Sequence, residues 1–124
     1  MGNRIALPIG PGRIVWAVAP SGRGEGKKRP LIIATRRVDI LRGTEIAAIG
    51  CSTEFSEPLT PTEIRLPHDP EGRGVTGLKQ DTVAVCDWIE RFPPGTRFEA
   101  GGMVPRELQR TVFATAGILL PPER

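Results

Sequence analysis

The chain has 124 residues, a length that suits one domain. Hydrophobic residues make up 39% and charged residues 25%, a balance typical of a folded globular protein and not of a disordered one. No run of about 18 apolar residues occurs, and residues 1–9 lack the apolar centre of a signal peptide. We therefore expect a cytoplasmic protein that does not bind a membrane. The formal net charge of +3 is compatible with an anionic partner but does not require one.

Glycine (15 residues) and proline (13 residues) are frequent, which favours short strands joined by turns over long helices. Runs of β-branched and apolar residues bounded by Gly and Pro predict the strands. These predicted strands are residues 13–19, 30–35, 44–50, 63–66, 82–89 and 98–102. Residues 44–50 contain alanines that also allow a short helix, and residues 63–66 alternate as a half-exposed edge strand does. Residues 36–42 are interpreted as a turn or a short irregular segment.

A helix is predicted for residues 104–116. Pro105 suits its first position, Glu107 lies in the first turn, where the helix dipole favours a carboxylate, and Gly117 can end it. The predicted fold class is mainly β, a small barrel or strongly bent sheet with one helix near the C-terminus. We expect a single domain over residues 1–124, with loose tails at about 1–11 and 118–124.

A basic, glycine-rich loop separates the first two predicted strands. Residues 22–30 carry three glycines and four cations, the last of which is Arg29. Pro30 favours an extended conformation at Arg29 and so places this arginine where the loop meets the strand. A positioned arginine suits contact with phosphate. An ordinary solvated hairpin loop is the alternative interpretation.

The sequence gives little support for a metal site or for catalysis by a thiol. The sequence has one histidine, His68, and two cysteines, Cys51 and Cys86, without any ligand spacing, so we expect no metal and no cofactor. Free cysteines in or beside apolar runs are usually small core residues. A thiol–imidazole pair with His68 remains an open alternative. Asp87 and Glu90 could hold a basic residue at a site or face solvent.

Hydroxyl groups follow the third predicted strand at Ser52 and Thr53. Cleaving RNA without a metal needs help for the 2′-hydroxyl to lose its proton, a cation for the crowded phosphate, and a proton source for the leaving oxygen. Arg29 with neighbouring hydroxyls could bind and polarise a phosphate, although arginine is a poor proton donor at its normal pKa. Turn capping is the ordinary alternative for both hydroxyls.

Four segments together resemble the MazF/PemK family of bacterial toxins, which are messenger-RNA interferases. Residues 12–16 (Gly-Arg-Ile-Val-Trp) resemble the family's opening strand, and residues 24–33 resemble its glycine-rich loop, which ends in Arg-Pro and an apolar strand. Residues 77–89 resemble the segment with Gly-Leu, a polar pair and Asp-Ser/Thr-Val. Residues 101–108 resemble the turn and Pro-x-Glu-Leu helix start near the C-terminus. The segments keep the family's order over most of residues 12–113.

The resemblance implies an SH3-like barrel of the CcdB/MazF type and a homodimer. It also implies metal-independent endoribonuclease activity on single-stranded RNA at short sequence motifs, leaving a 2′,3′-cyclic phosphate. The implied partner is a cognate antitoxin whose acidic tail occupies the RNA groove. Arg29 matches the family's catalytic arginine. Strict alignment places Gly50 where the family has a catalytic threonine, so Thr53 or Ser52 would serve if a bulge or a shifted strand end brings one of them in.

The remaining candidates concern binding. Arg23, Lys27 and Lys28 are expected to attract the RNA backbone, and His68 is a further candidate for touching RNA. Trp16 and Trp88 are interpreted as core or dimer contacts more readily than as stacking platforms. A catalytically inactive module of the same fold, which binds RNA or a protein partner, is the alternative function. A CcdB-like toxin that blocks a protein target such as DNA gyrase is a third, which the Arg-Pro loop disfavours.

Overall fold

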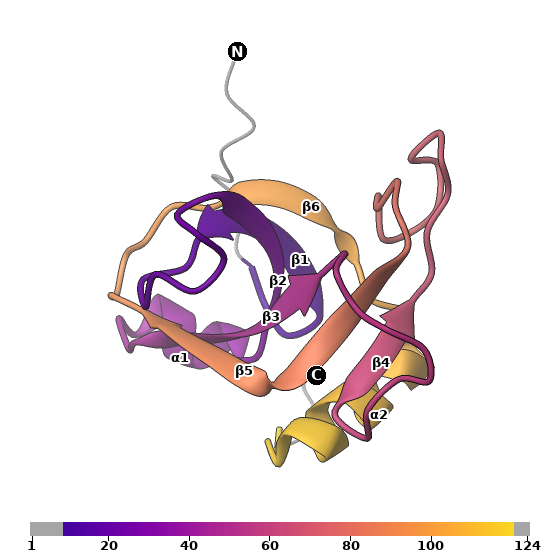
Figure 1. The fold of residues 1–124 in the computed structure, drawn as a ribbon. Coiled ribbons are helices and arrows are strands. Elements are labelled where there is room, and N and C mark those ends of the chain that lie inside the picture. Colours follow the sequence, from indigo (N-terminus) through magenta and orange to yellow (C-terminus); the bar gives the residue numbers. More distant parts are fainter. Residues whose placement is uncertain (1–8, 121–124) are drawn as a thin grey trace.

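Six strands form one antiparallel sheet in the computed structural model, which describes residues 9–120. The order across the sheet is β4-β5-β3-β2-β1-β6, and the sheet curls into a half-barrel with a helix packed beside it (Figure 1). This arrangement confirms the predicted fold class. The elements are β1 (Arg13–Val18), β2 (Lys28–Ile33), α1 (Arg37–Leu41), β3 (Ile46–Ser52), β4 (Glu63–Leu66), β5 (Thr82–Phe92), β6 (Glu99–Met103) and α2 (Arg106–Ala116).

The sheet buries apolar side chains on both of its faces, as expected when neighbouring residues of a strand point to opposite sides. Ile14, Ile32 and Ile49 lie in a cluster that includes Val112 and Phe113 of α2. The residues next to them in the strands, such as Val15 and Leu31, lie in a second cluster with two phenylalanines, Phe92 and Phe98. Both faces are therefore covered, and α2 packs against β5 on one of them.

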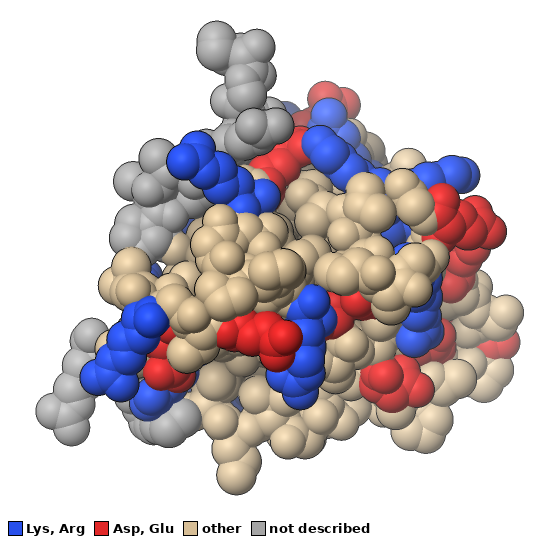
Figure 2. Space-filling view, turned by 90° about the vertical axis from the view of Figure 1, so that its left-hand side faces the viewer, with Lys and Arg blue, Asp and Glu red and all other residues tan. Residues whose placement is uncertain are grey.

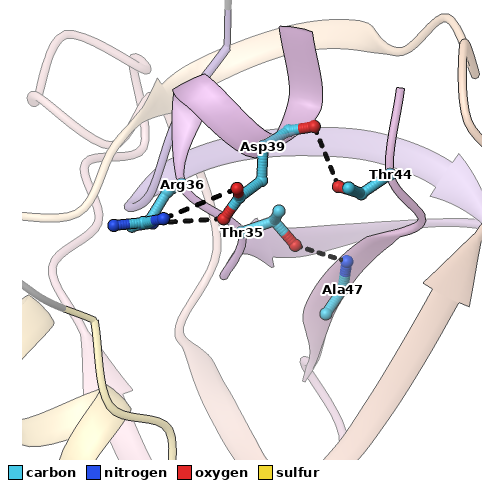
Figure 3. Close-up of polar contacts among 5 residues, drawn as sticks. All are labelled: Thr35, Arg36, Asp39, Thr44 and Ala47. Carbon is cyan, nitrogen blue, oxygen red and sulfur yellow. Dashed lines mark hydrogen bonds and ion pairs between the residues drawn. The ribbon is translucent and has the colours of Figure 1, made fainter. Parts of the chain in front are cut away.

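Residues 36–42, expected as a turn or irregular segment, instead contain the short helix α1. Arg36 donates to the carboxylate of Asp39, and the carbonyl of Asp39 accepts from the hydroxyl of Thr44 at 2.9 Å (Figure 3). The Thr35 hydroxyl accepts from the backbone N–H of Ala47 at 2.7 Å (Figure 3). These side-chain contacts hold the connection from β2 into β3, which fixes where β3 begins.

Element ends differ from the predictions at several places: β2 begins at Lys28, two residues early, and β5 continues past residue 89 to Phe92. β3 extends through Ser52 instead of ending at Gly50, because Cys51 and Ser52 pair with Ala84 and Val83 of β5. The register between the two strands shifts after Ile49, and β5 bends sharply there (Figure 1). At the C-terminal helix the predicted start is too early: α2 begins at Arg106, after Pro105, and ends as predicted at Gly117 in a left-handed conformation.

The loop between β4 and β5 bridges towards the opposite edge strand of the sheet. The backbone N–H of Gly102 in β6 donates to Thr76 at 3.2 Å, and that of Met103 donates to Val75 at 2.9 Å. Gly102 allows this approach, since a Cβ atom there would lie 2.2 Å from the carbonyl oxygen of Val75. The loop is closed at its neck by a bond from Asp69 N–H to the carbonyl of Leu78, at 2.9 Å. The bridge thus ties β6 to the segment that leads into β5.

Parts of the expected tails pack against the sheet. Ile9 is buried, and Ile118 and Leu120 pack against the cluster beside α2. The remainder of these tails, residues 1–8 and 121–124, lies outside the described residues. Neither helix within residues 9–120 is long and apolar enough to cross a membrane.

Candidate functional site

A cavity of about 370 Å³ lies where β1, β2 and the end of β3 meet the segment that precedes β5. Its apolar lining comes from Trp16, Pro30, Cys51 and Leu78, and its polar lining from Lys28, Arg29, Thr53, Lys79, Gln80 and Thr82. Three of these groups are cationic and none is acidic; Lys28 is paired with Glu99, so Arg29 and Lys79 carry the charge that makes the cavity favour an anion.

Arg29 is held at the junction of loop and strand, as predicted from its place before Pro30. Its side chain is half-buried, and its Nε and Nη2 atoms donate to the carbonyl oxygen of Gly24 at 3.3 and 3.2 Å. The same oxygen accepts the backbone N–H of Lys27 at 3.2 Å, so the turn that contains Gly24 orients the guanidinium. The Nη1 atom of Arg29 makes no hydrogen bond with any residue in the described part of the chain. Arginine has five N–H donors, so this side chain retains donors for a phosphate.

The two candidate hydroxyls differ in their surroundings. Thr53 lines the cavity together with Arg29, and its hydroxyl bonds to no residue in the range 9–120. Ser52 does not line the cavity, and its hydroxyl is engaged with the backbone of Glu54, accepting at 3.0 Å and donating at 3.1 Å. The structure thus places Thr53 in the wall of the same cavity as Arg29 and gives Ser52 the turn-capping contacts weighed as the ordinary alternative.

Gly50 occupies the position where the resemblance leads one to expect a threonine. A Cβ atom at residue 50 would lie 2.1 Å from the indole ring of Trp88, closer than any real contact. Trp88 is buried, so its ring cannot move aside freely. The space of a side chain at residue 50 is therefore filled by Trp88. Because β3 extends to Ser52, the hydroxyls of Ser52 and Thr53 lie beyond Gly50 along the chain.

Trp88 belongs to a polar network around the buried carboxylate of Glu90. Glu90 accepts the Ser21 hydroxyl at 2.5 Å, the Ser21 backbone N–H at 3.2 Å and the Trp88 indole N–H at 2.6 Å. The guanidinium of Arg23 lies 4.5 Å from the centroid of the Trp88 ring. Burial acts to raise the pKa of Glu90, but the hydrogen bonds from Ser21 and Trp88 and the charge of Arg23 together bring it below its ordinary value. Of the two acidic residues noted in this strand, Glu90 therefore faces the basic loop, whereas Asp87 is exposed.

The predicted RNA-binding residues do not all meet at the cavity. Lys28 lines it and forms an ion pair with Glu99. Arg23 and Lys27 lie exposed in the basic loop and do not line the cavity. His68, in the loop after β4, is also exposed and also does not line the cavity. RNA contact by these three residues stays a prediction that concerns the surface around the cavity.

Thiol chemistry is disfavoured by the state of both cysteines. Burial raises the pKa of Cys51 far above its ordinary value, and burial with the nearby Asp87 raises the pKa of Cys86 to about 11. Both thiols stay protonated near neutral pH and neither can act as a thiolate nucleophile. Within residues 9–120 no group of three or more His, Cys, Asp or Glu side chains is arranged to hold a metal ion.

Sequence reasoning missed several residues at the site. Lys79 and Gln80 line the cavity, and they are the polar pair inside the segment 77–89 that carries the resemblance. Their place in this segment was the signal in the sequence that could have identified them as site residues. Ser21 carried no signal, because its partner Glu90 lies on a strand distant in sequence.

Comparison with known proteins places the fold. No protein-family model matches the chain, and no curated protein matches its sequence. Solved structures do match. The crystal structure of a MazE–MazF complex from Deinococcus radiodurans aligns with a TM-score of 0.65 and 16% identity, covering 90% of this chain and 93% of that one. The Mycobacterium tuberculosis toxin MazF-mt6 aligns with a TM-score of 0.58 and 23% identity, covering 86% and 90%. The half-barrel with its C-terminal helix is therefore the MazF fold.

Proposed function

We propose that this protein is a toxin-type endoribonuclease that cuts single-stranded RNA at short sequence motifs. The observation that carries the proposal is the cationic cavity that brings Arg29 and Thr53 together in a MazF fold. In the proposed reaction the 2′-hydroxyl loses its proton and attacks the adjacent phosphorus, the bond from phosphorus to the 5′-oxygen of the next nucleotide breaks, and that oxygen takes up a proton as it leaves. The product is a 2′,3′-cyclic phosphate.

Arg29 suits the part of the reaction in which negative charge builds up on phosphate. A preorganised cation aimed at developing charge is among the largest contributions that a catalytic site makes. The Gly24 carbonyl orients the guanidinium before substrate arrives, so little reorganisation is needed. Thr53 supplies a hydroxyl in the wall of the same cavity, which can donate to a phosphate oxygen. This arrangement supports a metal-independent reaction, and the test below includes a chelator for that reason.

The MazF fold also suggests which partners this protein binds. The D. radiodurans neighbour was solved as a MazE–MazF complex. We propose a cognate antitoxin with an acidic tail for this chain, since a cavity whose lining includes Arg29 and Lys79 and no carboxylate would attract one. We also propose a homodimer and a cytoplasmic site of action.

The decisive test is cleavage of a long single-stranded RNA by the purified protein in the presence of EDTA. We expect cutting with 2′,3′-cyclic phosphate ends, detected by mass spectrometry, and no cutting of DNA of the same sequence, which lacks the 2′-hydroxyl. Arg29→Ala is expected to lower the rate by about a hundredfold or more. Arg110→Ala, an exposed arginine of α2, is the matched control and should cut at the wild-type rate.

Two observations favour a second function. Residue 50 cannot carry the expected threonine, and the Ser52 hydroxyl is engaged with Glu54. A catalytically inactive module that binds RNA or a protein partner would fit this arrangement. Wild-type protein that retards RNA in a gel but leaves it uncut, with or without EDTA, would replace the endoribonuclease proposal by this one.

A further inference from the structure

A buried carboxylate holds the base of the basic loop. Glu90 is only 4% exposed and accepts three hydrogen bonds, two from Ser21 at the start of the loop and one from the Trp88 indole. Hydrogen bonds to an ionised group are roughly twice as strong as neutral ones. The Ser21 hydroxyl also accepts the backbone N–H of Arg23 at 3.2 Å, so it joins the carboxylate to the next turn of the loop.

The loop continues from this anchor to Arg29 through a series of tight turns. Gly22 N–H donates to Ala19 at 3.0 Å, and Glu25 N–H donates to Gly22 at 3.2 Å. The next carbonyl in the series is that of Gly24, which accepts the Arg29 guanidinium. Gly24 has a φ of +90°, which a glycine adopts without strain, and a Cβ atom there would lie 3.2 Å from the Arg29 side chain. The position of the Gly24 oxygen therefore depends on where the loop is anchored.

The other side of the anchor is equally constrained. Trp88 fills the space above Gly50, so its indole N–H has a fixed place from which to donate to Glu90. Arg23 lies against the outer face of the same ring. The loop is thus fastened to β5 at two points, by the Ser21–Glu90 hydrogen bonds and by the Arg23–Trp88 contact.

We propose that Ser21 and Glu90 are positioning residues for the endoribonuclease reaction, which set the orientation of the Arg29 guanidinium through the Gly24 carbonyl. This inference rests on the proposed function for its consequence on the rate. Neither residue lines the cavity, so neither touches the substrate there. Their effect is on the geometry of the arginine that does.

Removing the Ser21 hydroxyl is the direct test. Ser21 is exposed, so Ser21→Ala leaves the buried core intact, and Ser21→Thr keeps a hydroxyl that can donate to Glu90. Ser56→Ala, an exposed serine in the loop after β3, is the matched control. In Ser21→Ala we expect the cleavage rate at saturating RNA to fall about tenfold, because small misplacements of a catalytic group cost rate more than binding. The RNA concentration for half-maximal rate should change little, and Ser21→Thr should recover most of the loss.

A second measurement reads the arginine itself. The Nε–H signal of Arg29 in a ¹H–¹⁵N spectrum, assigned with Arg29→Lys, reports its bond to Gly24. We expect this signal to shift or broaden in Ser21→Ala and to stay in place in Ser56→Ala. An unchanged Arg29 signal in Ser21→Ala overturns the positioning role, whatever the rates are. An equal rate in Ser21→Ala and Ser56→Ala also overturns it, provided that the wild type cuts RNA.

The two proposals fail separately. If the wild-type protein leaves RNA intact, the endoribonuclease proposal fails, while the Arg29 signal still decides whether Ser21 and Glu90 orient this side chain. If the wild type cuts RNA and the Ser21→Ala signal is unchanged, the function stands and the positioning role is lost. Glu90→Gln is a second variant, which keeps the size of the side chain. It should shift both the Arg29 Nε–H signal and the Trp88 indole N–H signal, since its amide cannot accept every bond that the carboxylate does.

Discussion

The absence of a side chain at Gly50 allows the Trp88 ring to pack against the backbone of β3. The indole of Trp88 lies where a Cβ atom of residue 50 would be, so a side chain there must displace a buried ring. We expect Gly50→Ala to lower the free energy of unfolding by roughly 1–3 kcal/mol, as overpacking of a core does. Urea unfolding followed by circular dichroism measures this loss.

Replacing Trp88 by a smaller residue provides a control for this prediction. In a Trp88→Leu background the obstacle is smaller, so adding Gly50→Ala should cost less than in the wild-type protein. A double-mutant cycle separates the two contributions. Equal costs in both backgrounds would show that the ring is not what excludes a side chain at residue 50.

Glu90 gives stability a defined dependence on pH. Its pKa in the fold lies below its ordinary value of 4.5, because the hydrogen bonds from Ser21 and Trp88 outweigh the effect of burial. A lowered folded pKa contributes stability that is complete above the unfolded pKa and is lost as pH falls through the folded one. We therefore expect the difference in unfolding free energy between wild type and Glu90→Gln to shrink as pH is lowered from 7 towards about 3.

Urea unfolding at several pH values checks this dependence. Glu71→Gln changes an exposed carboxylate in the loop after β4 and serves as the matched control. A Glu90→Gln difference that stays constant from neutral to acidic pH would contradict the assigned role of the carboxylate.

The basic loop and the cavity are separate elements that both carry cations. Lys79 lines the cavity, whereas Lys27 lies exposed on the loop. Each phosphate contact to single-stranded RNA contributes about 0.7 to the slope of log affinity against log salt. We expect Lys79→Gln and Lys27→Gln each to lower this slope by about that amount, measured by fluorescence anisotropy in an Arg29→Ala background, in which cutting should be slow.

Arg42→Gln, which alters an exposed cation after α1, should leave the salt slope unchanged. A Lys27→Gln slope equal to that of this control would remove the loop tip from the RNA contact. A Lys79→Gln slope equal to the control would remove the cavity from it.

Local patterns predicted the elements that depend on local chemistry. The polar–apolar alternation at Glu63–Leu66 placed β4 and its edge position correctly, and Gly117 marked the end of α2. The short helix α1 was missed because its five residues have no capping side chain of their own. The contacts that close it, from Arg36 and Thr44 to Asp39, are visible only in the folded connection.

Long-range contacts explain what the sequence could not predict of the site. Arg29 was found from the proline that follows it, and it does lie at the loop–strand junction. The extension of β3 through Ser52 depends on pairing with Val83, and the role of Ser21 depends on Glu90. Neither partner is near in sequence, so no local pattern could indicate these contacts.

Charge over the whole molecule is mixed. On the face shown in Figure 2, Lys and Arg side chains alternate with Asp and Glu around an uncharged area. This agrees with a net charge of only +3. Attraction of an anionic partner therefore falls to particular places, and the cationic cavity combines positive charge with depth.

The bridge between Gly102 and Thr76 separates two parts of one loop. Val75 and Thr76, just before the cavity-lining residues 77–80, bond to β6, and Leu78 in the cavity wall accepts the Asp69 N–H at the neck of the loop. The tip, residues 70–73, takes part in neither fastening and is held by local bonds from Gly72 and Arg73 to Asp69. Loop-closure entropy rises slowly with added length. For protein engineering, a peptide tag or a reporter domain is thus best inserted next to Glu71, which is exposed, and not at Gly72, where an added Cβ would meet the cavity-lining Lys79 side chain at 3.0 Å.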